Sequence, residues 1–177
     1  MIELIKITTS NPNYEFVEEL LHSSFPDNER RDDALQRDNT DNNEKFSTLL
    51  ISDNGENIGV ITIWHLNGFC YVEHLATSPS VRNKGYGSKI IFALTEMING
   101  MIVLEVELPE DEMSRRRIGF YERCGFRLCH KPYFQPPYRK GDEKLPMHIM
   151  FSGKEEVDNE FENIKSEIYS NVYNWCE

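Results

Sequence analysis

Two apolar runs joined by Asn67-Gly68 constrain the fold more than any other feature of this chain. The runs read "IGVITIWHL" (58–66) and "FCYVEHLAT" (69–77), and both alternate in the manner of strands. Asn-Gly between such runs is the strongest short-range signal for a β-hairpin, because both residues tolerate positive φ. We therefore predict that the two runs are antiparallel neighbours in a sheet.

Strand-like and helix-like segments alternate through the rest of the chain. Periodicity predicts further strands at Ile2–Thr8, "FSTLLIS", "MIVLEVEL", "FRLCHKP" and "LPMHIMFS". Helices are predicted over 13–22, from about 85 to 99, and over "SRRRIGFYERCG". "SSFPDNERR" breaks the first helix and can begin another, whereas the polar segment Asp38–Glu44 is expected to be a loop. This order predicts a mixed α/β (α+β) domain.

The last part of the chain differs in character from the rest. Six apolar residues fall on one face of a predicted helix: Val157, Phe161, Ile164, Ile168, Val172 and Trp175. The opposite face is acidic. We predict an acidic amphipathic extension, residues 153–177, beside a domain of residues 1–152. The extension is expected to pack on the domain or on a partner subunit, as in a homodimer.

Composition excludes several classes of protein. The net charge of -11 argues against a general nucleic-acid binder, whose footprint would be basic. No stretch approaches the roughly 18 apolar residues that a membrane span needs. The four cysteines form no CxxC pair. They are therefore interpreted as reduced thiols in a cytoplasmic protein, and neither zinc nor another metal is expected.

The loop "SPSVRNKGYGSKII" (78–91) has features of an anion site. It lies between a predicted strand and a predicted helix, where backbone N–H groups lack partners and the helix dipole favours negative charge. Gly85 and Gly87 would let the backbone approach a bulky anion. Residues 75–95 contain no acid but include Arg82, Lys84 and Lys89. The alternative interpretation is a tight turn with solvated lysines.

Three known phosphate motifs do not match this loop. A Walker A loop needs Gly-Lys-Ser/Thr, but Gly87 is followed by Ser-Lys. A dinucleotide fingerprint needs a third glycine where Ile90 stands, and the glycine loop of kinases fails for the same reason. What remains is R-x-x-G-x-G, from Arg82 to Gly87.

This pattern resembles the pyrophosphate-binding motif [QR]-x-x-G-x-[GA] of the GCN5-related N-acetyltransferase (GNAT) superfamily. "IGFYERCGF" (118–126) is similar to the pattern of the family's fourth helix. The order of elements also matches from residue 2 to about 151, but the tail lies outside the common core. The resemblance implies a mostly antiparallel central sheet flanked by helices, and acetyl-CoA as cosubstrate.

The resemblance also implies which residues hold acetyl-CoA. Backbone amides of the loop would hold the pyrophosphate, and the end of the preceding strand would pair with the pantetheine arm. One N–H group of that strand would act as an oxyanion donor. The loop residues are Arg82, Asn83, Lys84, Gly85, Tyr86, Gly87 and Ser88, and the strand residues are Leu75, Ala76 and Thr77.

Glu73 is the candidate general base. Its strand runs into the cosubstrate site, and a carboxylate among apolar neighbours can have a raised pKa. The family counterpart often acts through a water molecule; the alternative is a solvated strand glutamate. His74 is expected to point to the opposite face as a core or surface histidine, and His65 is a weaker rival base.

Tyr121 is the candidate general acid. It matches the family tyrosine in "FYERCGF", and a phenol with an unperturbed pKa of about 10 can protonate a leaving thiolate. The alternative is an ordinary tyrosine of an amphipathic helix. Cys124 lies one turn away, but the family transfers the acetyl group directly, so a packing role is expected for it.

The predicted function is transfer of an acetyl group to a primary amine, expected to be that of a small molecule, by direct attack in a ternary complex. The resemblance places the acceptor near "SSFPDNERR" and "YFQPPYRKGDEK", so Phe25, Glu29, Tyr133 and Tyr138 are candidate contacts. One alternative is acetylation of a protein N-terminus or lysine. Another is a non-catalytic CoA-binding sensor or interaction module.

Overall fold

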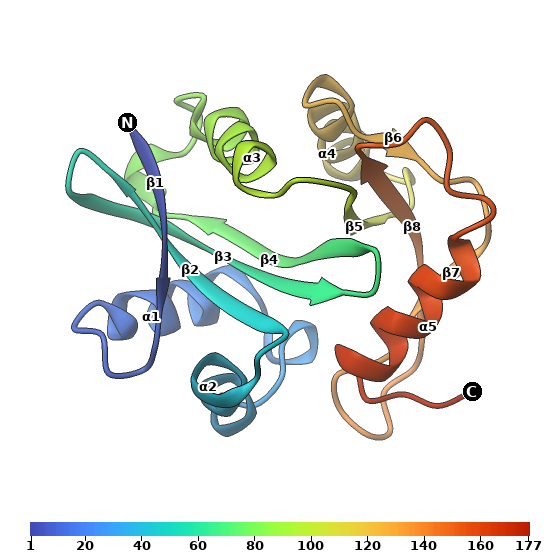
Figure 1. The fold of residues 1–177 in the computed structure, drawn as a ribbon, viewed down its shortest axis with the longest axis horizontal. Coiled ribbons are helices and arrows are strands. Elements are labelled where there is room, and N and C mark those ends of the chain that lie inside the picture. Colours follow the sequence, from blue (N-terminus) through green and yellow to red (C-terminus); the bar gives the residue numbers. More distant parts are fainter. The chain divides into compact units, whose positions relative to one another are not determined.

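The computed structural model describes residues 1–177 and divides into two compact units. Unit 1 comprises Met1–Trp64 and Val72–Met97, and unit 2 comprises His65–Tyr71 and Ile98–Glu177. The chain forms eight strands and five α-helices (Figure 1). None of these helices has both the length and the apolar character needed to cross a membrane.

The sheet of unit 1 has the strand order β1-β2-β3-β4. These strands are β1 (Ile2–Ile7), β2 (Phe46–Asp53), β3 (Glu56–Leu66) and β4 (Phe69–Thr77), and β1–β2 and β2–β3 pair antiparallel. The predicted hairpin is confirmed: Asn67-Gly68 joins β3 to its neighbour β4. Gly68 alone takes the left-handed conformation there, at φ +87°.

Helices cover both faces of this sheet. α1 (Tyr14–Ser24) and α2 (Asp33–Asn42) lie on one face, and α3 (Tyr86–Met97) lies on the other (Figure 1). The apolar residues of α1 form a core with side chains of β2, β3 and β4. This core includes Val17, Leu20, Leu21, Leu50, Val60 and Ala76.

α2 corrects the prediction that Asp38–Glu44 is a loop, because the helix continues to Asn42. The carboxylate of Asp32 caps it by accepting a 2.9 Å hydrogen bond from the N–H of Leu35. The buried side of the helix is polar, and its Thr40 hydroxyl lies 2.8 Å from the Thr48 hydroxyl of β2. A helix that docks through hydroxyl groups lacks the apolar periodicity on which the prediction depended.

Strand β8 is the centre of the sheet in unit 2. β5 (Ile102–Glu107), β6 (Arg127–Leu128) and β7 (Tyr133–Gln135) all pair antiparallel with β8 (Leu145–Ser152). β7 makes the beginning of "YFQPPYRKGDEK" a hairpin arm, whereas the strand predicted over "FRLCHKP" is only two residues long. α4 (Glu112–Arg123) ends before Gly125, which has φ +93°.

The C-terminal extension contains α5 (Phe161–Asn171) and belongs to unit 2. Asn163 Nδ2 donates a 3.1 Å hydrogen bond to the carbonyl of Asn67, and the N–H of Asn67 donates one of 3.3 Å to Glu167. The tip of the β3–β4 hairpin, residues 65–71, also belongs to unit 2, and these bonds join α5 to it. Of the six apolar positions, all except Trp175 are buried: Val157, Phe161, Ile164, Ile168 and Val172. The boundary at residue 152 and the packing of the extension on a second copy stay predictions.

Candidate functional site

The loop between β4 and α3 presents open backbone at the start of a helix. A short 3₁₀ helix, η2 (Pro79–Val81), follows β4, and then Asn83 and Gly85 take positive φ values of 62° and 76°. A Cβ at Gly85 would have nothing within 4 Å, so the main chain there is open to a ligand. The first N–H groups of a helix have no partners within it and attract anions. The loop therefore suits a phosphate-bearing group.

Side chains of the loop fix its position on unit 1. Arg82 Nε donates a 3.1 Å hydrogen bond to the carbonyl of Thr77 at the end of β4. The Tyr86 hydroxyl donates a 3.0 Å bond to Asp53 Oδ2 at the end of β2. Lys84 Nζ reaches the carbonyl of Ser80 at 2.7 Å. These contacts order the loop, and the exposed Arg82 and Lys84 give it positive charge.

The end of β4 comes unusually close to β3. A Cβ built on Gly59 of β3 would lie 2.5 Å from the carbonyl oxygen of Ala76, which is closer than real Cβ atoms approach. The N–H of Ser78 donates a 2.8 Å hydrogen bond to the carbonyl of Ile58. Leu75 and Thr77 are half-buried around the buried Ala76. The absence of a side chain at residue 59 thus sets the path of the predicted pantetheine-binding residues.

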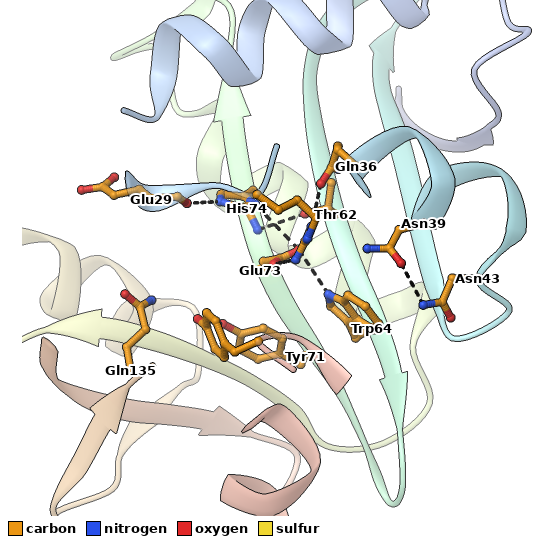
Figure 2. A network of polar contacts seen from close by, with 12 residues as sticks. Glu29, Gln36, Asn39, Asn43, Thr62, Trp64, Tyr71, Glu73, His74 and Gln135 are labelled. Atoms are coloured by element: carbon orange, nitrogen blue, oxygen red, sulfur yellow. Dashed lines mark hydrogen bonds and ion pairs between the residues drawn. The ribbon is translucent and has the colours of Figure 1, made fainter. Parts of the chain in front are cut away.

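The carboxylate of Glu73 is fully buried in unit 1 and has strong partners (Figure 2). Arg31 donates to both of its oxygens, with Nη1 at 3.1 Å from Oε2 and Nη2 still closer to Oε1. The indole Nε1 of Trp64 donates a further bond of 3.1 Å to Oε2. Residue 73 as a whole is only partly buried, so its main chain is the part that reaches solvent.

The Arg31 contact reverses the expected titration of Glu73. Burial alone would raise the pKa of this carboxyl group, but the charges of Arg31 and His74 and the hydrogen bonds from Arg31 and Trp64 favour the ionised form. The pKa of Glu73 therefore lies below its usual value, and the expectation of a raised pKa is wrong. Arg31 gave no signal in the sequence, because it lies 42 residues before its partner.

His74 is a hydrogen-bonded core histidine. Its Nε2 is 2.9 Å from the carbonyl oxygen of Glu29, and its ring packs edge-on against Phe25 with centroids 4.5 Å apart. Burial lowers its pKa, so the imidazole is neutral at pH 7. Its Nδ1 lies 3.8 Å from Glu73 Oε2. His74 therefore lies beside the candidate base, and the expectation that it points away from Glu73 is wrong.

Unit 1 thus brings Phe25 and Glu29 to β4 through His74. Phe25 is half-buried, whereas the side chain of Glu29 is exposed and contributes its carbonyl. Their contact with an acceptor stays a prediction.

Tyr121 lies on α4 in unit 2. Its ring packs against Phe120 and Phe126, at centroid distances of 5.1 and 5.5 Å. Burial raises the pKa of Tyr121 from the unperturbed value of 10.0 to about 12. The phenol therefore keeps its proton at neutral pH. Burial also raises the pKa of Cys124, which favours the thiol over a nucleophilic thiolate.

The candidate acceptor residues of unit 2 lie around a buried carboxylate that was not predicted as part of the site. Tyr133, which is 2% exposed, donates a 2.6 Å hydrogen bond to Glu105 of β5. Gln135 and Tyr173 donate bonds of 2.5 and 2.8 Å to the same carboxylate. The ring of Tyr138 packs on Tyr173, with centroids 5.0 Å apart. A glutamate inside the apolar run "MIVLEVEL" was the available signal for this cluster.

Comparison with known proteins identifies the fold. A protein of Bacteroides thetaiotaomicron assigned to the GNAT family of acetyltransferases has a structure similar to this chain, with 43% identity and a TM-score of 0.96. The match covers 98% of this chain and 99% of that one. It confirms the predicted mixed α/β fold with a mostly antiparallel sheet. No curated protein sequence matches the chain.

More distant structures share the fold alone. An aminoglycoside 6′-N-acetyltransferase in complex with coenzyme A matches with 18% identity and a TM-score of 0.60, covering 86% of this chain and 96% of that one. Naa50 of Arabidopsis thaliana, in complex with the bisubstrate analogue CoA-Ac-MVNAL, matches with 19% identity and a TM-score of 0.60. That match covers 86% of this chain and 99% of the other.

The family assignment comes from the sequence itself. Residues 14–126 match the model of the acetyltransferase (GNAT) family. This range contains the R-x-x-G-x-G loop, β4 and the tyrosine of α4. Together with the near-complete structural match, it shows that the chain belongs to the GNAT family of acetyltransferases.

Proposed function

We propose that this acetyltransferase moves the acetyl group of acetyl-CoA to a primary amine of a small molecule, by direct attack in a ternary complex. The observation that carries the proposal is the open backbone between β4 and α3. It combines positive φ at Asn83 and Gly85 with positive side chains and a helix N-terminus. These features fit the pyrophosphate of acetyl-CoA.

The loop and the end of β4 would bind different parts of acetyl-CoA. Backbone N–H groups from Asn83 to Ser88 would hold the pyrophosphate, with Arg82 and Lys84 beside them. Main-chain groups of 75–77 would pair with the pantetheine arm. One N–H of that segment would donate to the carbonyl oxygen as negative charge develops on it.

Glu73 and Tyr121 are the proposed proton carriers. Bound acetyl-CoA supplies the thioester, whose carbon–sulfur bond breaks as the bond from carbon to the amine nitrogen forms. Because the carboxylate of Glu73 has no exposed surface, it would take the amine proton through a water molecule. Tyr121 would give the proton of its hydroxyl to the departing sulfur, and solvent would return one to it.

An acetyl-CoA binding and turnover experiment tests this proposal. Calorimetry with the purified chain should show binding of acetyl-CoA. A panel of small primary amines and short peptides should then show which acceptor accelerates release of CoA. Glu73→Gln and Tyr121→Phe should each retain acetyl-CoA binding and lose turnover. Binding without turnover on any acceptor would favour a sensor, and absence of binding would refute the proposal.

A further inference from the structure

Arg31 is a buried side chain that makes several polar and ring contacts beside the candidate base. It lies between the 3₁₀ helix η1 (Asp27–Glu29) and α2, and it is 6% exposed. Besides binding both oxygens of Glu73, its Nη1 donates a 2.6 Å bond to Gln36 Oε1. Its guanidinium also lies over the rings of Phe46 and Trp64, at 5.6 and 5.7 Å from the centroids. These contacts hold the guanidinium from several sides.

This arrangement fixes the orientation of the Glu73 carboxylate. A planar guanidinium that binds both oxygens allows a carboxylate little rotation. Trp64 adds a third hydrogen bond from the neighbouring strand β3. The carboxylate therefore has one well-defined position on β4.

The same chain segment carries the candidate acceptor contacts Phe25 and Glu29. Arg30 Nε donates a 3.0 Å hydrogen bond to the carbonyl of Phe25, which holds this segment compact. The carbonyl of Glu29 is bound to His74, the residue after Glu73. The segment is thus tied to two consecutive residues of β4, by Arg31 at Glu73 and by Glu29 at His74.

We propose that Arg31 is a positioning residue for acetyl transfer, which keeps Glu73 an oriented anion and couples the 25–29 segment to β4. This inference rests on the proposed function, because it takes Glu73 as the base and the segment as part of the acceptor site. The role differs from a purely structural one, since loss of Arg31 should change the titration of Glu73 and the use of the acceptor.

The pH at which Glu73 titrates depends on the charged and polar groups that face its carboxylate. Arg31 contributes a fixed positive charge from the segment before α2, and His74 on β4 adds to it when its imidazole is protonated. Trp64 on β3 is a neutral donor. Without Arg31, burial would dominate, and the carboxyl group would titrate at higher pH than in the parent.

Fluorescence of Trp64 can follow that titration without turnover. The chain has two tryptophans, so Trp175→Phe leaves Trp64 as the reporter. In this background we expect no transition from Glu73 above its ordinary pKa of about 4.3. Arg31→Met should bring a transition into the range above that value, and Arg31→Lys should lie between the two. Adding Glu73→Gln should abolish it, because a transition that survives this change belongs to His74.

Arg37→Met is the matched control. Arg37 lies on α2 and forms an ion pair of 2.7 Å with Glu18, away from Glu73. It should alter neither the Trp64 titration nor turnover. In contrast, Arg31→Met should raise the KM for the acceptor and lower kcat/KM at least about tenfold, with little change in the affinity for acetyl-CoA.

The outcomes separate this inference from the proposed function. An unchanged Trp64 titration in Arg31→Met overturns the positioning role even if the parent enzyme acetylates amines. A parent that never turns over refutes the proposed function, and with it the kinetic part of this inference. If Arg31→Met does not fold, Arg31→Met/Glu73→Gln should restore folding, because it removes both buried charges. If that double variant also stays unfolded, Arg31 serves folding and the positioning role is wrong.

Discussion

Tyr133 donates a hydrogen bond of 2.6 Å to Oε1 of Glu105, whose carboxylate forms no ion pair with any residue of the chain. Burial raises the pKa of Glu105, against the opposing effect of hydrogen bonds from Tyr133, Tyr173 and Gln135. The folded state therefore binds this proton more tightly than the unfolded state does. Stability contributed by the group is fully present below the unfolded pKa and is lost as the pH rises through the folded one.

Glu105→Gln should remove this pH dependence. Above the unfolded pKa of about 4.3, the free energy of unfolding of the parent should fall relative to that of the variant, by about 1.4 kcal/mol per pH unit until the folded pKa is reached. Urea denaturation of both proteins from pH 4.5 to 8 measures the difference. A parent-minus-variant difference that stays constant or rises with pH would contradict the raised pKa.

Tyr121→Phe should separate catalysis from stability. The Tyr121 hydroxyl forms no hydrogen bond within the protein, so the free energy of unfolding should change by less than about 0.5 kcal/mol. Loss of a general acid should lower kcat about 10²-fold to 10⁴-fold. A Tyr121→Phe protein that retains full kcat would remove this residue from the mechanism.

The pH profile of the parent enzyme provides a second check on Tyr121. Because the pKa of this phenol is raised to about 12, it should stay protonated throughout the working range of the enzyme. No loss of kcat at basic pH should therefore arise from Tyr121. If the parent loses activity near pH 10 and Tyr121→Phe does not, the phenol titrates lower than burial implies.

Gly85→Ala should weaken acetyl-CoA binding. An alanine at φ +76° is strained by about 1–2 kcal/mol, and its relaxation would move the backbone donors of the loop. Gly68→Ala in the β3–β4 turn is a matched control, since it has φ +87° and equally open surroundings. Both variants should lose similar stability, but only Gly85→Ala should raise the Kd for acetyl-CoA in calorimetry. Equal Kd values for the two would place the anion elsewhere.

The docking of α2 should show strong coupling between two hydroxyl groups. Thr40 donates to the carbonyl of Gln36 and therefore accepts from Thr48, whose side chain is fully buried. Thr40→Val leaves the Thr48 hydroxyl without its acceptor, at a cost of about 1–3 kcal/mol. Thr40→Val/Thr48→Val should cost less than the sum of the single changes, and a double-mutant cycle by urea denaturation measures this. Additive losses would mean that the hydroxyl pair contributes nothing.

The elements that were predicted correctly are those whose formation depends on residues close together in the sequence. The β3–β4 hairpin follows from Asn67-Gly68, and α4 ends at a glycine in the left-handed conformation, as its sequence indicates. α2 was missed in part because hydroxyl and amide groups, rather than apolar side chains, form its buried face. β7 is three residues long and depends on pairing with β8, which no local pattern reports.

The candidate site shows the same division. The R-x-x-G-x-G loop could be located from residue types alone, since its chemistry depends on backbone freedom and on nearby charge. The state of Glu73 could not, because it depends on Arg31, a partner that only the tertiary fold brings into contact. From the sequence, Glu73 is predicted to be an unpaired base on a strand. In the structure it forms a buried ion pair with Arg31.

Gly59 has a consequence for attempts to redesign this protein. Because Gly59 has no side chain, β3 can approach the carbonyl of Ala76, and residue 59 therefore sets the distance between β3 and the end of β4. A larger residue at position 59 would push the end of β4 away from β3, without any change in the sequence of the loop between β4 and α3. Engineering of the predicted pantetheine-binding residues could therefore begin at Gly59, on the neighbouring strand β3.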